Sequence, residues 1–231
     1  MIIVITGASK GLGKSFAEIF AEQNTLLLCA RNEDVLRQTA MQLQQQYPSA
    51  NIHYKKTDMR NKQEVIAFAN WCNSFGTTDI LINNAGKFVA GSICTEDDTT
   101  LEMMMETNVY SAYYLTKLLV AKMKENKQGH IFNICSIASL QAYSNGGSYS
   151  ISKFALLGFS KNLREELKPY GIKVTAVMPG AVYTDSWSGT GVLEERIMEV
   201  KDIAKMVKAA SQLSFNACVE EIVIRPQLGD I

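Results

Sequence analysis

Tyr149 and Lys153 are the residues of this chain whose types and spacing most directly suggest chemistry. They lie four positions apart in a segment of helical pattern, so their side chains leave one helix face about a turn apart. A phenol has a pKa of about 10, and a cation about 4 Å away lowers that pKa by at most about three units. The pair therefore suits general acid–base catalysis. The alternative is a boundary tyrosine beside a solvated lysine, so the surroundings must decide.

A glycine turn follows the first apolar run, with the sequence Thr6-Gly7-Ala8-Ser9-Lys10-Gly11-Leu12-Gly13 and then an amphipathic segment. Glycines let backbone pass close to a pyrophosphate, and a helix N-terminus offers it N–H groups and partial positive charge. The spacing is GxxxGxG and not the commoner GxGxxG. A turn glycine with a helix cap is the alternative, but the position between a strand and a helix favours nucleotide binding.

Arg31 stands at the end of the second apolar run, where chains specific for NAD usually carry an acid for the ribose 2′-hydroxyl. A guanidinium fork suits a phosphate, and Lys10 supplies a second charge for the same group. Glu33 and Asp34 are typical of the first turn of a helix capped by Asn32. These residues favour NADP over NAD, with a solvated surface arginine as the alternative.

Short β-branched and aliphatic runs alternate with longer segments of helical period, which predicts a doubly wound α/β fold with one parallel seven-stranded sheet and three layers. The predicted strands are Ile2–Thr6, Thr25–Ala30, Ile52–Thr57, Asp79–Asn83, His130–Cys135, Lys173–Met178 and Glu221–Arg225. The predicted helices are Leu12–Gln23, Glu33–Tyr47, Lys62–Phe75, Thr99–Glu125, Ser148–Leu167 and Ile203–Leu213. The strands are nearly continuous in apolar residues, which is typical of strands covered on both faces.

Composition excludes several classes of protein. The 231 residues carry 23 basic and 23 acidic side chains, so no overall field favours nucleic acid or an anionic membrane. Two histidines and five scattered cysteines predict no zinc site and a reduced, cytoplasmic protein. No apolar run approaches the roughly 20 residues that span a bilayer. No linker divides the chain, so residues 1–231 are predicted to form one domain.

The least regular stretch runs from Tyr183 to Glu194, within a predicted substrate loop near residues 183–200. Ser, Gly and Thr crowd around Trp187 there. In a doubly wound fold this segment crosses the carboxyl edge of the sheet, where ligands bind. Trp187 suggests an apolar lid, although an ordinary surface loop remains an equal alternative.

Taken together, these residues make the chain resemble the short-chain dehydrogenase/reductase family, in its short single-domain branch, over almost the whole length. The resemblance is carried, in the family's order and close to its intervals, by Thr6-Gly7, Gly11, Gly13, Asp58, Asn83-Asn84-Ala85-Gly86, Asn108, Ser136, Tyr149, Lys153, Pro179-Gly180 and Thr184. It implies a Rossmann fold, a nicotinamide cofactor and a catalytic set of Asn108, Ser136, Tyr149 and Lys153.

The resemblance also implies a role for each residue of the set. Ser136 would hydrogen-bond the substrate carbonyl, Tyr149 would exchange the proton, and Lys153 would lower the pKa of Tyr149 while binding the nicotinamide ribose. Asn108 would hold a water that connects Lys153 to solvent; helical pattern alone would turn its side chain outward. Ser136 ends a predicted strand thirteen positions before Tyr149, the family's interval, and is preferred to Ser139. Two hydroxyl donors would stabilise negative charge on a reacting carbonyl oxygen.

The implied cofactor contacts extend over five loops and the segment of Tyr149 and Lys153. Asp58 would meet the adenine amino group and Met59 its ring, while Val182 and Thr184 would contact the carboxamide. The full expected cofactor set is Gly7, Ser9, Lys10, Gly11, Leu12, Gly13, Arg31, Asp58, Met59, Asn84, Ala85, Gly86, Tyr149, Lys153, Pro179, Gly180, Val182 and Thr184. Asn83 to Gly86 and Pro179-Gly180 are also ordinary turn signals.

We therefore predict an NADP(H)-dependent oxidoreductase that transfers hydride between nicotinamide and the carbonyl or alcohol of a small ketone, aldehyde or hydroxy compound. One alternative is 3-oxoacyl-[acyl-carrier-protein] reduction, for which Lys124, Lys127 and Lys168 could supply a basic patch. A non-catalytic NADP-binding sensor is another. Apolar residues on several faces of Thr99–Glu125 and Ser148–Leu167 exceed what one sheet requires, and in the family these helices form a four-helix dimer interface, commonly within a homotetramer.

Overall fold

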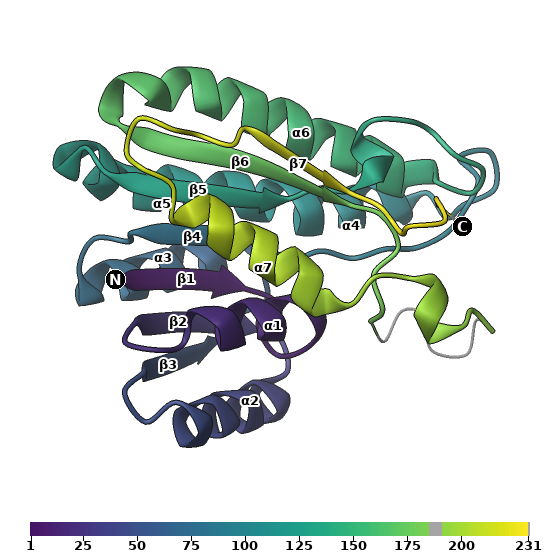
Figure 1. Cartoon of the computed structure of the whole chain (residues 1–231). Coiled ribbons are helices and arrows are strands. Elements are labelled where there is room, and N and C mark those ends of the chain that lie inside the picture. The colour runs from purple at the N-terminus through teal and green to yellow at the C-terminus, as the bar shows by residue number, and fades with distance from the viewer. Residues whose placement is uncertain (185–190, 231) are drawn as a thin grey trace.

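Seven parallel strands form one sheet in the order β3-β2-β1-β4-β5-β6-β7, and their arrows run the same way in Figure 1. The computed structural model describes residues 1–184 and 191–230. The strands are β1 (Ile2–Thr6), β2 (Thr25–Ala30), β3 (Asn51–Lys56), β4 (Ile80–Asn83), β5 (Gly129–Ile134), β6 (Ile172–Pro179) and β7 (Glu221–Ile224). The chain order reverses between β1 and β4, the point at which doubly wound sheets bind ligands.

Helices cover both faces of the sheet and give three layers. They are α1 (Gly11–Phe20), α2 (Glu33–Gln46), α3 (Lys62–Phe75), α4 (Thr99–Met105), α5 (Ser111–Asn126), α6 (Gly147–Leu167) and α7 (Val200–Ser211). Helices α1, α2 and α7 pack on one face around Phe16 and Phe20. Helices α3, α5 and α6 pack on the other, around Phe68 and Leu119. The predicted doubly wound sheet is confirmed.

Local chemistry explains where element ends differ from the predicted ones. Helix α1 ends at Phe20, three residues early, because the Asn24 side chain donates a hydrogen bond to the Phe20 carbonyl (2.9 Å) and Gln23 takes a left-handed conformation (φ 58°). Strand β3 is only partly buried because it is an edge strand. Its polar residues depart from the continuous apolar pattern of the central strands.

The predicted helix over Thr99–Glu125 is interrupted. Helix α4 ends at Met105, a π-helical turn η1 spans Glu106–Tyr110, and α5 begins at Ser111. The wider turn moves the following side chains around the helix axis, so Asn108 is buried with an exposed fraction of 1%. Single π-turns often mark functional positions.

The carboxyl ends of the strands form the edge that carries the predicted functional residues. The glycine turn follows β1, Arg31 follows β2, Asp58 follows β3, Asn84 follows β4 and Ser136 follows β5. Among the described residues, no helix combines the length and apolar character that a bilayer crossing requires.

Candidate active site

The turn between β1 and α1 is shaped by its glycines. Gly7 and Gly11 have φ angles of 66° and 55°, in the left-handed region that favours glycine. A Cβ on Gly13 would lie 2.1 Å from the Gly7 carbonyl oxygen, so the helix begins in direct contact with the turn. The hydroxyl of Thr39 on α2 donates to the Ser9 carbonyl (2.9 Å) and fixes the middle of the loop.

The N-terminus of α1 has no side-chain cap at Lys10. Its first backbone N–H groups, over Gly11 to Gly13, have no intrahelical acceptor and point toward the glycine turn. A short backbone turn without Cβ atoms at the start of a ten-residue helix has the chemistry that a pyrophosphate requires. The residues present therefore fit the phosphates of a dinucleotide.

Asn84 joins this turn to the end of β4. Its side-chain amide donates to the Thr6 carbonyl (2.9 Å), and the backbone N–H groups of Asn84 and Ala85 donate to the Thr6 hydroxyl (3.0 and 2.9 Å). A Cβ on Gly7 would lie 3.1 Å from the Ala85 Cα. The predicted segment Asn84 to Gly86 thus closes directly over the glycine turn.

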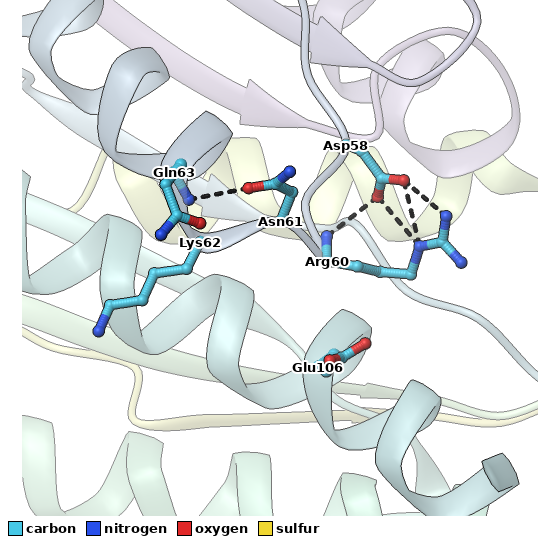
Figure 2. A pocket seen from close by; sticks show the side chains of 6 residues that line it. All are labelled: Asp58, Arg60, Asn61, Lys62, Gln63 and Glu106. Atoms are coloured by element: carbon cyan, nitrogen blue, oxygen red, sulfur yellow. Dashed lines mark hydrogen bonds and ion pairs between the residues drawn. The ribbon is translucent and has the colours of Figure 1, made fainter.

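Asp58 lies in a hollow beyond β3 that Figure 2 shows from close by, lined by Asp58, Arg60, Asn61, Lys62, Gln63 and Glu106. The Arg60 guanidinium donates to both carboxylate oxygens of Asp58, with its shortest hydrogen bond at 2.6 Å. Hydrogen bonding by Arg60 is the main cause that lowers the pKa of Asp58, and the charge of Arg31 lowers it further. Sequence reasoning missed Arg60. Its position two residues after Asp58, a predicted cofactor-binding residue, could have identified it.

The side chain of Met59 lies in the core and not at the surface of the site. It exposes 5% of its area and its sulfur lies 3.7 Å from that of Cys29. This position in the core does not favour the expected contact of the Met59 side chain with an adenine ring. The polar neighbours Asp58 and Arg60 form the accessible surface there.

Ser136 and Tyr149 meet at the end of β5. A side-chain hydrogen bond with Ser136 lowers the pKa of the Tyr149 phenol, while burial has the larger effect and raises it. The Ser136 oxygen accepts the Ala138 N–H (3.1 Å), so its own hydrogen is oriented away from that amide. Ser139, the alternative to Ser136, is turned back and accepts the Ser136 backbone N–H (3.2 Å).

Lys153 lies one helical turn after Tyr149 and is buried, with an exposed fraction of 6%. Its ammonium donates to the Ile134 carbonyl (2.8 Å) and lies 5.7 Å from the centre of the Tyr149 ring. Burial lowers the pKa of Lys153 to about 8. The expected lowering of the Tyr149 pKa by Lys153 stays a prediction, because burial dominates the phenol in this structure.

Asn108 connects three segments around this pair. Its amide donates to the Lys87 carbonyl (3.1 Å) and the Ser152 hydroxyl (2.8 Å), and its carbonyl accepts the Lys87 N–H (2.8 Å). The missing Cβ of Gly86 would lie 3.4 Å from the Asn108 side-chain oxygen and 3.7 Å from the Lys153 Nζ. The side chain thus holds the β4–α4 loop against α6.

The loop after β6 reaches the same edge. The Gly180 N–H donates to the Ile224 carbonyl (2.7 Å), and Val182 is buried and forms an isolated bridge with Met198. The Thr184 methyl lies 3.4 Å from the position of a Gly11 Cβ, so this loop touches the glycine turn. Trp187 lies outside the described residues.

Comparison with known proteins agrees with this arrangement. A sequence model of the short chain dehydrogenase family matches residues 1–191. The chain belongs to the short-chain dehydrogenase/reductase family. An uncharacterized oxidoreductase of Staphylococcus saprophyticus is 31% identical over 227 residues, which cover 97% of both chains. Another from Staphylococcus aureus strain MRSA252 is also 31% identical, over 97% of this chain and 96% of the relative.

Solved structures of this short-chain dehydrogenase/reductase fold include several with nicotinamide cofactors. An alcohol dehydrogenase from the archaeon Thermococcus sibiricus, complexed with 5-hydroxy-NADP, is 26% identical with a TM-score of 0.89, covering 98% of this chain and 96% of that one. L-Sorbose reductase from Gluconobacter frateurii, complexed with NADPH and L-sorbose, has the same identity and TM-score over 97% and 95%. These neighbours support an oxidoreductase that binds a nicotinamide cofactor.

Beneath the candidate site lies a buried network of polar side chains, of which sequence reasoning named only Asn83, as part of the segment Asn83 to Gly86. The Asn83 amide donates to the Asn133 side chain (2.8 Å) and to the Thr116 hydroxyl (3.0 Å), and the Asn133 amide donates to Ser160 (2.8 Å). Asparagines at the ends of β4 and β5 were the available signal. Among residues 1–184 and 191–230, no group of three or more His, Cys, Asp or Glu side chains could hold a metal ion.

Proposed function

We propose that this short-chain dehydrogenase/reductase is an NADPH-dependent carbonyl reductase that acts on a small ketone or aldehyde and runs in reverse as an alcohol dehydrogenase. One observation carries the proposal: Ser136 lies beside Tyr149 and lowers its pKa, and the Lys153 ammonium lies 5.7 Å from the centre of the Tyr149 ring. That set stands beside the uncapped start of α1, at the carboxyl edge of the sheet.

Ser136 and Tyr149 would bind the carbonyl oxygen of the substrate. The Ser136 oxygen already accepts a backbone N–H, which leaves its O–H to donate to the substrate. Negative charge grows on the carbonyl oxygen as hydride arrives, so two fixed donors stabilise the transition state more than the ketone. Burial raises the pKa of Tyr149, which keeps the phenol protonated and able to act as the acid in reduction.

Lys153 and Asn108 would support the proton transfer. After Tyr149 gives its proton to the alcohol oxygen, the remaining phenolate is stabilised by the Lys153 ammonium one turn away. The pKa of Lys153 is about 8, so the ammonium form dominates at neutral pH. Asn108 fixes the loop that passes beside the Lys153 Nζ and so keeps that charge in place.

The cofactor would lie along the turn that Gly7, Gly11 and Gly13 shape, with Asn84 to Gly86 above it and Thr184 at its nicotinamide end. NADPH, when bound, would supply the hydride that adds to the carbonyl carbon, and NADP⁺ would be the other product. Arg31 is exposed next to this turn and favours the 2′-phosphate. The neighbours crystallised with NADP and NADPH support the same choice.

The position of the basic residues favours a small carbonyl over a carrier-bound thioester. Lys124 and Lys127 lie at the end of α5 and Lys168 follows α6, so all three are at the amino edge of the sheet, opposite the catalytic residues. Lys124 also lies over the ring of Tyr170 (4.6 Å), and Lys168 pairs with Glu165 (2.5 Å). An acidic carrier protein would find no basic patch from these lysines beside Tyr149.

The test is Tyr149→Phe, assayed by NADPH oxidation with a panel of ketones, aldehydes and quinones. We expect at least a hundredfold loss of turnover, as removal of a general acid gives, with the Kd for NADPH changed less than threefold. A variant with near-normal turnover would overturn the mechanism. If no carbonyl consumes NADPH while NADPH binds tightly, the alternative of a non-catalytic nucleotide sensor is favoured.

A further inference from the structure

The ring of Tyr149 contacts an aromatic side chain that the catalytic set does not use. The ring of Phe88 lies edge-on to that of Tyr149, with centroids 4.8 Å apart and an interplanar angle of 85°. Phe88 comes from the loop between β4 and α4 and still exposes 48% of its area. A large apolar ring thus stays open to solvent beside the proposed proton donor, where a second apolar group can cover it.

Tyr143, on the loop before α6, lies close enough to Tyr149 for the charge of one phenol to affect the other. It exposes 44% of its area, and burial raises its pKa to about 12, with a further contribution from the nearby Tyr149. The missing Cβ of Gly146 would lie 3.2 Å from the Tyr143 ring, so the ring lies against the chain just before the helix begins. A phenol with this pKa stays uncharged, and its ring adds to the apolar surface beside Tyr149.

The loop that carries Phe88 is held to the helix that carries Tyr149. The Asn108 side chain accepts the backbone N–H of Lys87 and donates to its carbonyl, immediately before Phe88. The Gly91 N–H donates to the Asn145 carbonyl (3.0 Å), and the Glu96 carboxylate accepts hydrogen bonds from the hydroxyl and N–H of Ser148. Glu96 supplies the cap that the first turn of α6 otherwise lacks.

These contacts fix Phe88 and Tyr143 relative to Tyr149 before substrate arrives. Their backbones need little further ordering, so most of the apolar contact with a ligand appears as affinity. A carbonyl whose oxygen meets Ser136 and Tyr149 would have its substituents near the Phe88 ring, whose centroid lies 4.8 Å from that of the Tyr149 ring. An aryl group matches their shape and apolar character, whereas a polyhydroxylated chain would lose hydrogen bonds to water against aromatic carbon.

We propose that the substrate carbonyl carries an aryl group, which packs against Phe88 and Tyr143. The inference rests on the proposed reductase function and narrows its substrate class. Phe88 is then a specificity-determining residue, because it contacts the substituent and not the reacting carbon or oxygen. The wild-type protein is expected to reduce an aryl alkyl ketone with kcat/KM at least about tenfold above that for a small aliphatic ketone, the gain that one aromatic contact provides.

The experiment compares acetophenone, butanone and L-sorbose with NADPH, using the full chain and the variants Phe88→Ala and Phe88→Leu. We expect Phe88→Ala to lower kcat/KM for acetophenone about tenfold or more and to change that for butanone less than threefold. Phe88→Leu keeps apolar bulk and should recover part of the loss. Phe215→Ala is the matched control, because Phe215 exposes 67% of its area and lies against Gly171, at the amino edge of the sheet.

Two results would overturn the substrate class while leaving the reductase in place: preference for L-sorbose, or a loss in Phe88→Ala that is equal for all three carbonyls. If Tyr149→Phe keeps turnover, the proposed function fails instead. A binding measurement covers the case of no turnover: 1-phenylethanol is titrated by calorimetry in the presence of NADP⁺. Binding that weakens about tenfold in Phe88→Ala supports the aryl site, and binding unchanged by that substitution, or none, overturns it.

Discussion

At the scale of single residues, the charges around Asp58 determine how Arg31 can act. Arg60 pairs with both oxygens of the Asp58 carboxylate, and Arg31 affects that carboxylate only as a weaker, longer-range charge. Because Arg60 neutralises Asp58, the attraction of Asp58 for Arg31 is reduced. Arg31 therefore keeps the positive potential that a cofactor phosphate would meet.

We expect Arg31→Ala to weaken NADPH binding about tenfold to a hundredfold, the effect of losing charge-assisted hydrogen bonds to a phosphate, and to change NADH binding less than threefold. Fluorescence titration with each cofactor measures both constants. Arg37→Ala is the matched control, because Arg37 is an exposed arginine of α2 paired with Asp34. Equal weakening of both cofactors would show that Arg31 does not bind the 2′-phosphate.

The residues of the site differ in how far sequence alone could predict them. The spacing of Tyr149 and Lys153 suffices to place both on one helix face, and Ser136 follows from its place at the end of a strand. Asn108 could not be derived from periodicity, because an unbroken helix would turn it outward and only the π-helical turn buries it. Arg60 and Phe88 were missed because their roles depend on contacts between loops.

At the scale of elements, the start of α1 packs more closely against the glycine turn than any other two segments of the cofactor site pack against each other. A Cβ at position 13 would lie 2.1 Å from the Gly7 carbonyl oxygen, so Gly13→Ala forces the helix and turn apart. We expect a loss of about 1–3 kcal/mol in the free energy of unfolding and at least tenfold weaker NADPH binding. Urea titration and cofactor titration measure the two effects.

Gly158 provides the control for that substitution. It lies within α6, and a Cβ there would meet nothing within 4 Å. Gly158→Ala should leave cofactor binding unchanged and raise the free energy of unfolding by up to about 1 kcal/mol, because alanine is the better helix former. Similar losses of stability and NADPH affinity in both variants would mean that the close packing at Gly13 has no special role.

The sequence predicts the presence and order of the strands and helices more completely than the residues at which they begin and end. All seven strands and the three-layer order follow from alternation of apolar runs and helical periods. Helix α3 was predicted at both ends, because Asn61 caps its first turn with two hydrogen bonds to backbone N–H groups and Gly76 follows its last residue. The π-helical turn was not predicted, since α4, η1 and α5 share one polar and apolar pattern.

At the scale of the whole molecule, buried His130 makes stability depend on pH. It lies in β5 with 5% of its area exposed, and burial lowers its pKa to about 3 from 6.5. The unfolded chain binds a proton at pH 4.5 and the folded chain does not, so stability falls as pH drops below 6.5. The expected loss from pH 7 to pH 4.5 is about 2.5 kcal/mol.

His130→Gln should remove this part of the pH dependence, and the comparison is made by urea unfolding at pH 7 and pH 4.5. Glutamine retains a hydrogen-bonding group for the Thr175 hydroxyl, which lies 2.8 Å from the His130 Nε2. An unchanged pH dependence in His130→Gln would show that other groups cause the loss.

The whole molecule also has an exposed apolar surface, to which α4, η1, α5 and α6 contribute. Leu101 of α4, Tyr110 of η1, Tyr113 of α5 and Ile151 and Phe154 of α6 each expose between 41% and 45% of their areas. Tyr110 and Tyr113 are three positions apart, as are Ile151 and Phe154, so each pair shares one helix face. We expect this surface to pair with that of a second copy, because a closed two-fold interface buries the same patch on both chains.

The assembly is tested with Phe154→Glu, which places a charge in the middle of that surface at a position already 45% exposed. We expect light scattering to give a dimer or tetramer for the wild type at about 10 μM and a smaller species for the variant, because an unpaired buried charge costs several kcal/mol. Met206→Glu is the control: Met206 is 46% exposed on α7, which covers the opposite face of the sheet, so its assembly should match the wild type. A wild type that is monomeric at this concentration would contradict the expected pairing of the apolar surface, whereas dissociation of both variants would point to a general effect of added charge.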